Sequence, residues 1–199
     1  MSGYQSYQYL AESDRTVFRF DFPPEIGRVA STRPLVDPTQ EELVQQTLDQ
    51  YPVISLHSHP TRRPADPRQG AAYRRSGRDV TGYAGLSVSG MDALFDNMMD
   101  GSTMIVSRGG WTWNDVIFDM GMRQCDFAHQ DLVTIARTVR DIHDAKRSGQ
   151  IGAVLTLESL TCIESELDRI EVLSGLGLRS AGLFYSNSNQ LGSGAGRTA

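Results

Sequence analysis

Two histidines stand one residue apart at the end of a short apolar run. His57 closes residues 52–57, which are mostly β-branched or apolar, and His59 follows just before Pro60. Such a run is typical of a parallel β-strand buried on both faces. Residues i and i+2 of a strand point to the same side, so both imidazoles can face one point, and imidazole is a common zinc ligand. The pair predicts a metal site. The alternative is that both side chains only cap the strand by hydrogen bonds to loop backbone.

A carboxylate follows a second apolar run. Glu158 comes directly after residues 152–157, where an unpaired buried charge would be costly. Parallel-sheet enzymes carry their sites at the carboxyl ends of the strands. We therefore expect Glu158 beside the two histidines, where it would bind one metal ion or bridge two. The alternatives are an exposed loop acid, or an ion-pair partner of Arg108 or Arg179.

Other polar and aromatic residues carry weaker signals. His129 and His143 are expected 14 positions apart on one helix, too far to share a metal, so surface or packing roles are favoured. Trp111 and Trp113 either line a pocket or cover an end of the sheet. Six arginines between positions 62 and 78, among proline, glycine and alanine, predict a solvated loop. The alternative is a clamp for an anionic substrate.

Strands and helices alternate along the chain, which predicts an α/β fold with a parallel sheet. Four β/α units fit either a small doubly wound sheet or half of a barrel. Thr39 and Glu42 have the spacing of a capping box. The expected elements are a helix from Thr39 to about Gln50, the strand at 52–57, a long loop over 60–88, a helix over 91–99, a strand over 103–106, a helix over 126–147, a strand over 151–157, a helix over 164–173 and a strand over 178–185.

Composition excludes several classes of partner. The formal net charge is -5 and no basic block interleaves with aromatic residues, so nucleic acid is not an expected partner. The two cysteines, Cys125 and Cys162, lack the spacing of a thiolate zinc site. No apolar run reaches ~18 residues and no basic start precedes an apolar segment, so we expect no membrane contact and a cytoplasmic location. The expected partner is a small-molecule substrate, and a homodimer is left open.

The combined pattern resembles the membrane (renal) dipeptidase family of the amidohydrolase superfamily. The resemblance rests on His57-Ser58-His59 after an apolar strand, the helix ending at residues 144–150, the strand ending Leu157-Glu158, and residues 176–179 leading to 185–189. It covers roughly residues 45–195, and the spaced combination is more specific than any one motif.

The resemblance implies a (β/α)8 barrel with two zinc ions. Residues 39–199 would form the N-terminal half of that barrel, preceded by an N-terminal arm at residues 1–38. His57 and His59 would be ligands of one zinc ion, and Glu158 the catalytic-site carboxylate that bridges both. The remaining histidine ligands and a proton-managing acid of the family come from later strands, so we expect residues 1–199 alone to be inactive.

The resemblance also implies a reaction. Two zinc ions lower the pKa of water and polarise a scissile carbonyl, which suits hydrolysis of a dipeptide amide bond. Tyr185 and Asn189 would contact the substrate. The family usually has Asp at the position of His59 and a histidine at that of Tyr185. Hydrolysis of another small amide, lactone or ester is therefore the alternative, and a barrel scaffold without turnover is a third reading.

Overall fold

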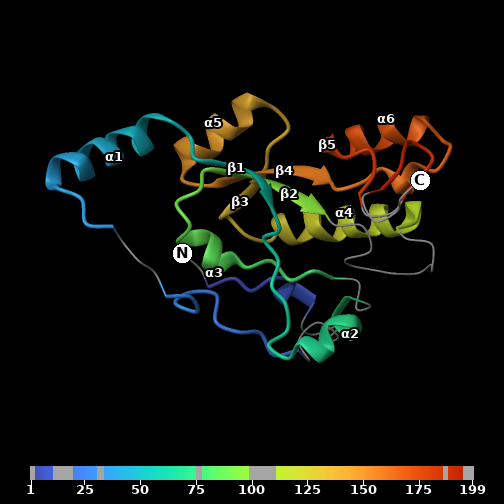
Figure 1. Cartoon of the computed structure of the whole chain (residues 1–199), viewed down its shortest axis with the longest axis horizontal. Helices are drawn as coiled ribbons and strands as arrows, with labels where there is room; N and C mark the ends of the chain where they lie inside the picture. The colour runs from blue at the N-terminus through green and yellow to red at the C-terminus, as the bar shows by residue number, and fades with distance from the viewer. Residues whose placement is uncertain are drawn as a thin grey trace.

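The computed structural model describes residues 3–10, 20–30, 34–74, 78–98, 111–185 and 188–194. Within them, five parallel strands form one sheet with helices packed against it (Figure 1), which confirms the predicted α/β class. The strands are β1 (Ile54–Ser58), β2 (Ala93–Met98), β3 (Val133–Ile135), β4 (Ile151–Leu157) and β5 (Leu178–Ala181). The α-helices are α1 (Pro38–Gln50), α2 (Gly70–Arg74), α3 (Tyr83–Ser87), α4 (Trp113–Phe127), α5 (Val139–Ser148) and α6 (Asp168–Gly175), and the short 3-10 helices are Gln8–Leu10, Pro67–Gln69 and Thr161–Ile163.

Strand β4 is the centre of the sheet. β2 pairs with β4 along nearly the whole length of β4, from Gly152 to Leu157. Since a strand has only two edges, β3 and β5 share the other edge, β3 beside residues 151–153 and β5 beside residues 155–157. β1 pairs with the far side of β2. Strands β1, β2, β4 and β5 therefore follow one another across the sheet in chain order, as consecutive barrel strands do, and the carboxyl ends of β1, β2 and β4 lie at one rim.

The two faces of the sheet are covered by different helices. Alternate residues of a strand point to opposite faces. On one face, Ala153, Leu155 and Leu157 of β4 join the larger apolar core with α4 and α6. On the other face, Val154 packs with Ile142 of α5 in a smaller core. In Figure 1, α4 and α5 accordingly lie on opposite sides of the strands.

Strand β2 replaces a helix that the sequence pattern predicts. The apolar residues between 91 and 99 fit one face of a helix, but residues 93–98 pair with both β1 and β4. Leu94 and Met98 face the larger core, while Ala93 and Phe95 belong to the smaller one. A central strand with both faces covered needs apolar residues on both sides, and a short segment of that kind mimics helical spacing. The strand predicted at 103–106 lies outside the described residues.

The helix predicted over residues 126–147 is wrong, because the chain forms the end of α4, then β3 and α5 there, and the rest of α4 was not predicted. Gln130 ends the first helix with its side chain: Nε2 donates to the carbonyl oxygens of Phe127 and Val133, and Oε1 accepts from the backbone N–H of Leu132 and Val133. Thr138 then opens α5 with a capping box. Local side-chain hydrogen bonds thus interrupt an apolar pattern that is continuous in sequence.

Smaller differences concern element ends and exposure. Helix α1 begins at Pro38 with a capping box of Asp37 and Gln40 in place of Thr39 and Glu42. The expected loop over 60–88 contains α2 and α3. β1 is not buried on both faces, since Leu56 is 73% exposed. It is the edge strand of the described sheet, with β2 as its only neighbour there. The helix expected from 164 starts at 168, and the strand expected to reach 185 ends at 181.

The segment at residues 3–10 is docked on α4 through Asp126. This fully buried carboxylate accepts hydrogen bonds from Tyr4 Oη at 2.7 Å, Ser6 Oγ at 2.6 Å and the backbone N–H of Tyr7 at 2.7 Å. A fourth bond comes from Tyr83 Oη on α3 at 2.8 Å. Burial and the Asp126 charge raise the pKa of the Tyr83 phenol, so the phenol remains a donor. One carboxylate therefore joins three segments that are distant in sequence.

Among the described residues, none of the helices has both the length and the apolar character needed to cross a bilayer.

Candidate metal centre

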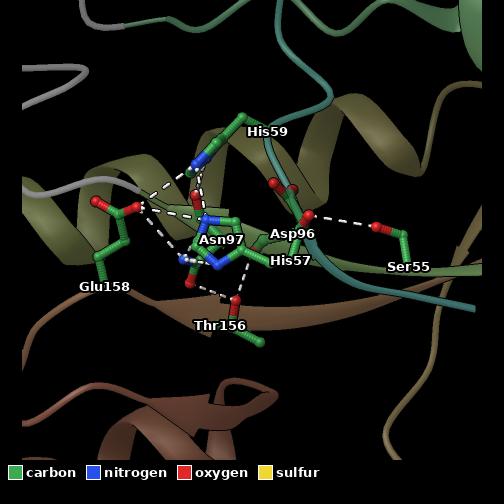
Figure 2. Close-up of polar contacts among 7 residues, drawn as sticks. All are labelled: Ser55, His57, His59, Asp96, Asn97, Thr156 and Glu158. Atoms are coloured by element: carbon green, nitrogen blue, oxygen red, sulfur yellow. Dashed lines mark hydrogen bonds and ion pairs between the residues drawn. The ribbon is translucent and has the colours of Figure 1, made fainter.

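Three side chains converge at the rim where β1, β2 and β4 end. His57 Nε2 lies 3.1 Å from His59 Nε2, and Glu158 Oε1 lies 3.7 Å from the first nitrogen and 3.4 Å from the second (Figure 2). The Glu158 side chain is 4% exposed, whereas that of His57 is 62% exposed. The centre therefore has a buried carboxylate on one side and an opening to solvent on the other.

The spacing of these atoms fits a divalent cation. Ligand atoms at ~2.0–2.1 Å from a tetrahedral zinc ion lie about 3.3–3.4 Å from one another. The three observed separations, 3.1, 3.4 and 3.7 Å, fall around that value. Two imidazoles and a carboxylate are also a donor set that zinc commonly takes, although manganese and iron accept such a mixed set as well. The described residues thus bring together the predicted ligands, and their role as ligands stays a prediction.

The backbone explains why the carboxylate reaches this position. The N–H of Glu158 donates to the carbonyl oxygen of Met98 at 3.1 Å, which continues the β2–β4 pairing one residue beyond β4. Residues 152, 154, 156 and 158 share one side of this ladder. Glu158 therefore projects on the same side as Thr156, toward the end of β2.

Asn97 of β2 lies in the middle of the centre, and the sequence interpretation missed it. Its carbonyl oxygen is 2.8 Å from His59 Nδ1, and its amide nitrogen is 3.1 Å from His57 Nδ1 and 3.5 Å from Glu158 Oε1. Its amide oxygen accepts from Thr156 Oγ1 at 2.8 Å. The available signal was a polar residue near the end of an apolar strand, but the segment was predicted to be a helix.

A buried ion pair supports the site from the opposite face of β2. Asp96 is 1% exposed, and its carboxylate lies 3.0 Å from Nη1 of Arg123 on α4. Asp79 lies 3.9 Å from the same guanidinium group. Burial raises the pKa of Asp96, and the Arg123 charge opposes that shift. The pair ties β2 to α4 one residue before Asn97.

The alternative roles weighed for Glu158 and the arginines find little support. Arg179 donates to the backbone carbonyl oxygens of Arg137, Ser174 and Leu178, and Arg108 lies outside the described residues. Three of the loop arginines are paired with carboxylates, as Arg62–Glu25, Arg63–Asp79 and Arg68–Asp66. These pairs favour a structural loop over an anion clamp.

The remaining candidates lie on other elements. His129 stacks on Tyr9 with ring centroids 3.8 Å apart, and His143 is an exposed residue of α5. The two histidines are therefore not on one helix, and the packing or surface roles expected of them agree with these positions. Trp111 is buried in the larger core, and Trp113 lies under the Arg169 guanidinium group.

The two predicted substrate contacts lie on the segment after β5. Tyr185 is 50% exposed. Asn189 Nδ2 donates to the Leu183 carbonyl oxygen at 2.7 Å and to Thr161 Oγ1 at 3.3 Å. These bonds order the segment, and substrate contact by either residue stays a prediction.

Comparison with known proteins agrees with this picture. A sequence profile of the family described as membrane dipeptidase (peptidase family M19) matches residues 119–199, a segment that contains Glu158. This match confirms the resemblance inferred from the sequence. No match was found among curated protein sequences.

A solved structure shares the fold. The crystal structure of an amidohydrolase from Pseudomonas aeruginosa superimposes with a TM-score of 0.51 at 16% sequence identity. The match covers 77% of this chain and 40% of that one, so this chain spans less than half the length of its structural neighbour. The similarity supports a partial TIM-barrel fold, with β1, β2, β4 and β5 as consecutive barrel strands.

Proposed function

We propose that this chain forms part of the metal centre of a metal-dependent hydrolase of the amidohydrolase superfamily, and that its reaction is the hydrolysis of a dipeptide amide bond. The observation that carries the proposal is the convergence of His57 Nε2, His59 Nε2 and Glu158 Oε1 within 4.8 Å of one another. The family match over residues 119–199 gives independent support, since it was found on a segment that excludes both histidines.

Each residue of the centre has a distinct part. His57 and His59 would hold a zinc ion from the end of the edge strand, and Glu158 would hold it from the end of β4 and could bridge to a second ion. When bound, such ions supply Lewis acidity and lower the pKa of water toward neutrality. The buried side of the centre excludes bulk water around Glu158, while the exposed side at His57 admits a small substrate. Tyr185 and Asn189 are proposed to contact that substrate.

The centre needs further ligands for a second ion. Three side chains satisfy one catalytic zinc ion, which normally keeps three protein ligands and one water molecule. A bridged pair needs more, and the match covers only 40% of the structural neighbour. We propose that the remaining ligands come from strands that complete the barrel.

Zinc binding tests the centre. The wild-type protein, His59→Ala and His143→Ala are stripped of metal and titrated with zinc against a chelating indicator. We expect the wild type and His143→Ala to bind zinc with equal affinity, and His59→Ala to bind at least about tenfold more weakly, because loss of even an outer partner costs about 10–100-fold. Equal affinities in all three proteins would rule out the centre.

Turnover tests the substrate. The zinc-loaded full-length protein, with the strands that complete the barrel, is assayed on a panel of dipeptides, on small N-acyl amides and on lactones and esters. Cleavage of dipeptides in preference to the others supports the dipeptidase proposal. Preference for an amide, lactone or ester identifies the alternative reaction, which the unusual residues His59 and Tyr185 suggest. Zinc binding without turnover on any of them indicates a scaffold.

A further inference from the structure

Asn97 contacts all three proposed ligands through two different chemical groups. Its backbone carbonyl oxygen contacts His59, and its side-chain amide contacts His57 and Glu158 (Figure 2). The inference below rests on the proposed function, because it concerns how these residues present themselves to a metal ion. It adds a residue for which neither the family match nor the metal cluster assigns a role.

The carbonyl contact determines the tautomer of His59. A carbonyl oxygen only accepts, so His59 Nδ1, which lies 2.8 Å away, carries the proton. In the neutral ring, Nε2 then presents its lone pair toward His57 and Glu158. A metal-ligating histidine usually donates its other ring N–H to a carbonyl or carboxylate in this way. His59 is therefore held in its metal-binding tautomer by the backbone of β2.

The orientation of the Asn97 side-chain amide determines the tautomer of His57, and the amide has two possible orientations. The amide nitrogen lies 3.1 Å from His57 Nδ1 and 3.4 Å from His57 Nε2. The shorter distance favours Nδ1 as the acceptor, which leaves the proton on Nε2. That N–H can donate to His59 Nε2 at 3.1 Å. The amide nitrogen also donates to Glu158 Oε1 at 3.5 Å. This orientation suits a centre without a cation, because the imidazole nitrogen atoms of His57 and His59 and the Asn97 amide nitrogen then all have hydrogen-bond partners.

A half-turn of the amide about the Cβ–Cγ bond of Asn97 exchanges its oxygen and nitrogen and gives the second orientation. The amide nitrogen then takes the place of the amide oxygen, which lies 2.8 Å from Thr156 Oγ1, and donates to the hydroxyl. The hydroxyl can in turn donate its single proton to the backbone carbonyl oxygen of Asp96, 3.1 Å away. In the observed orientation, the single proton of the Thr156 hydroxyl faces two acceptors, the amide oxygen of Asn97 and the backbone carbonyl oxygen of Asp96. The amide oxygen now accepts from His57 Nδ1–H, and His57 Nε2 is left with a free lone pair. The oxygen also approaches Glu158, a repulsion that a cation bound to the carboxylate would offset.

We propose that Asn97 is a positioning residue that selects the tautomers of His57 and His59, and that its amide makes a half-turn when a zinc ion takes the place of the His57 Nε2 proton. On loading, one proton leaves His57 Nε2 to solvent and one is taken up at Nδ1, so the imidazole stays neutral. Both Nε2 lone pairs and the Glu158 carboxylate would then be available as ligands.

Nitrogen-15 NMR of the imidazole rings tests the tautomers directly. In the metal-free wild type we expect a protonated Nδ1 on His59 and a protonated Nε2 on His57, and zinc should move the His57 proton to Nδ1. Asn97→Asp offers only acceptors, so His57 should hold its proton on Nδ1 even without metal. Asn97→Leu should leave His59 unchanged, because the backbone carbonyl remains, and should remove the preference at His57.

Zinc affinity gives a second readout. Asn97→Leu should bind zinc about 10–100-fold more weakly than the wild type, whereas Asn97→Asp should bind at least as tightly. Thr156→Val keeps Asn97 but removes the hydroxyl that holds the amide, and should give a smaller loss. Asn114→Leu and Asn114→Asp, at an exposed position on α4, are matched controls and should bind as the wild type does.

The outcomes separate this inference from the metal centre itself. If Asn97→Asp loses as much affinity as Asn97→Leu, donation to Glu158 matters and the tautomer role is overturned. If the wild type binds no zinc, the proposed function fails, and the metal-free spectra still decide on Asn97. Identical His57 tautomers in Asn97→Asp and Asn97→Leu would then overturn its role.

Discussion

Glu158 Oε1 lies 3.4 Å from His59 Nε2, although the two residues follow strands that do not touch each other. Strand β2 lies between β1 and β4 and brings their carboxyl ends to the same rim. The centre therefore depends on the pairing of three strands.

Glu158→Gln should weaken zinc binding more than any change in an outer partner, hence by more than about 10–100-fold. The substitution keeps the shape of the side chain and removes the negative charge that offsets the cation. Isothermal titration of the metal-free proteins measures it. Glu166→Gln, at an exposed position between β4 and α6, is the matched control. Unchanged affinity in Glu158→Gln would exclude the carboxylate as a ligand.

In the full-length protein, His57→Ala should abolish zinc-dependent turnover and leave the fold intact, because the side chain lies at an open rim and is 62% exposed. Far-ultraviolet circular dichroism and thermal unfolding check the fold, and a hydrolysis assay checks activity. His143→Ala, on the exposed surface of α5, should retain activity. Turnover at the wild-type rate in His57→Ala would show that this residue is not a ligand.

Gly182→Ala should disturb the centre through the backbone. A Cβ atom at Gly182 would lie 2.3 Å from the carbonyl oxygen of Glu158, so β5 or Glu158 must shift. We expect weaker zinc binding together with a lower midpoint of urea unfolding. Gly175→Ala is the control, since nothing lies within 4 Å of a Cβ atom there. If both variants bind zinc as the wild type does, the position of Glu158 does not depend on its contact with β5.

Asp126→Ala should destabilise the protein by at least about 3 kcal/mol, because each buried donor left without an acceptor costs about 1–3 kcal/mol. Four donors now reach this carboxylate, from Tyr4, Ser6, Tyr7 and Tyr83. Urea unfolding gives the free energy of unfolding. Asp131→Ala, at an exposed position, should change it by no more than about 0.5 kcal/mol. A small loss in Asp126→Ala would mean that residues 3–10 contribute little to stability.

The capping box of α5 should give a pH-dependent stability. Backbone N–H groups of Arg137 and Thr138 donate to Asp141 and lower the pKa of its carboxyl, Arg137 most strongly. A lowered pKa in the folded state means that the stabilisation is present above the unfolded value of about 3.9 and is lost as the pH falls through the folded value. Asp141→Asn should therefore be less stable than the wild type at pH 7, and the difference should shrink below pH 4. A difference that persists unchanged at pH 2 would contradict the titration of Asp141.

The sequence by itself indicated the candidate ligands and two of the three strands that position them, β1 and β4. His57, His59 and Glu158 could be selected because polar ligand side chains directly follow apolar runs, and parallel strands end at one rim. Strand β4 was predicted with its observed ends, because a short apolar run flanked by glycine and polar residues is typical of a strand buried on both faces. The α/β class followed from the alternation of such runs with amphipathic helices.

Only the tertiary structure decided the identity of β2 and the residues that it carries. Its apolar spacing fits a helix as well as a strand, and pairing with β1 and β4 resolves the choice. Asn97 and Asp96 were missed as a consequence, since their side chains gain their roles only when β2 is placed between the two ligand-bearing strands. Strand β3 was missed for a similar reason, because the helix predicted over 126–147 merged the end of α4, β3 and α5. Gln130 ends α4 through hydrogen bonds to backbone atoms rather than through any apolar signal. Periodicity reports which faces are buried, whereas hydrogen bonds between distant segments, which periodicity does not record, determine how those faces are assembled.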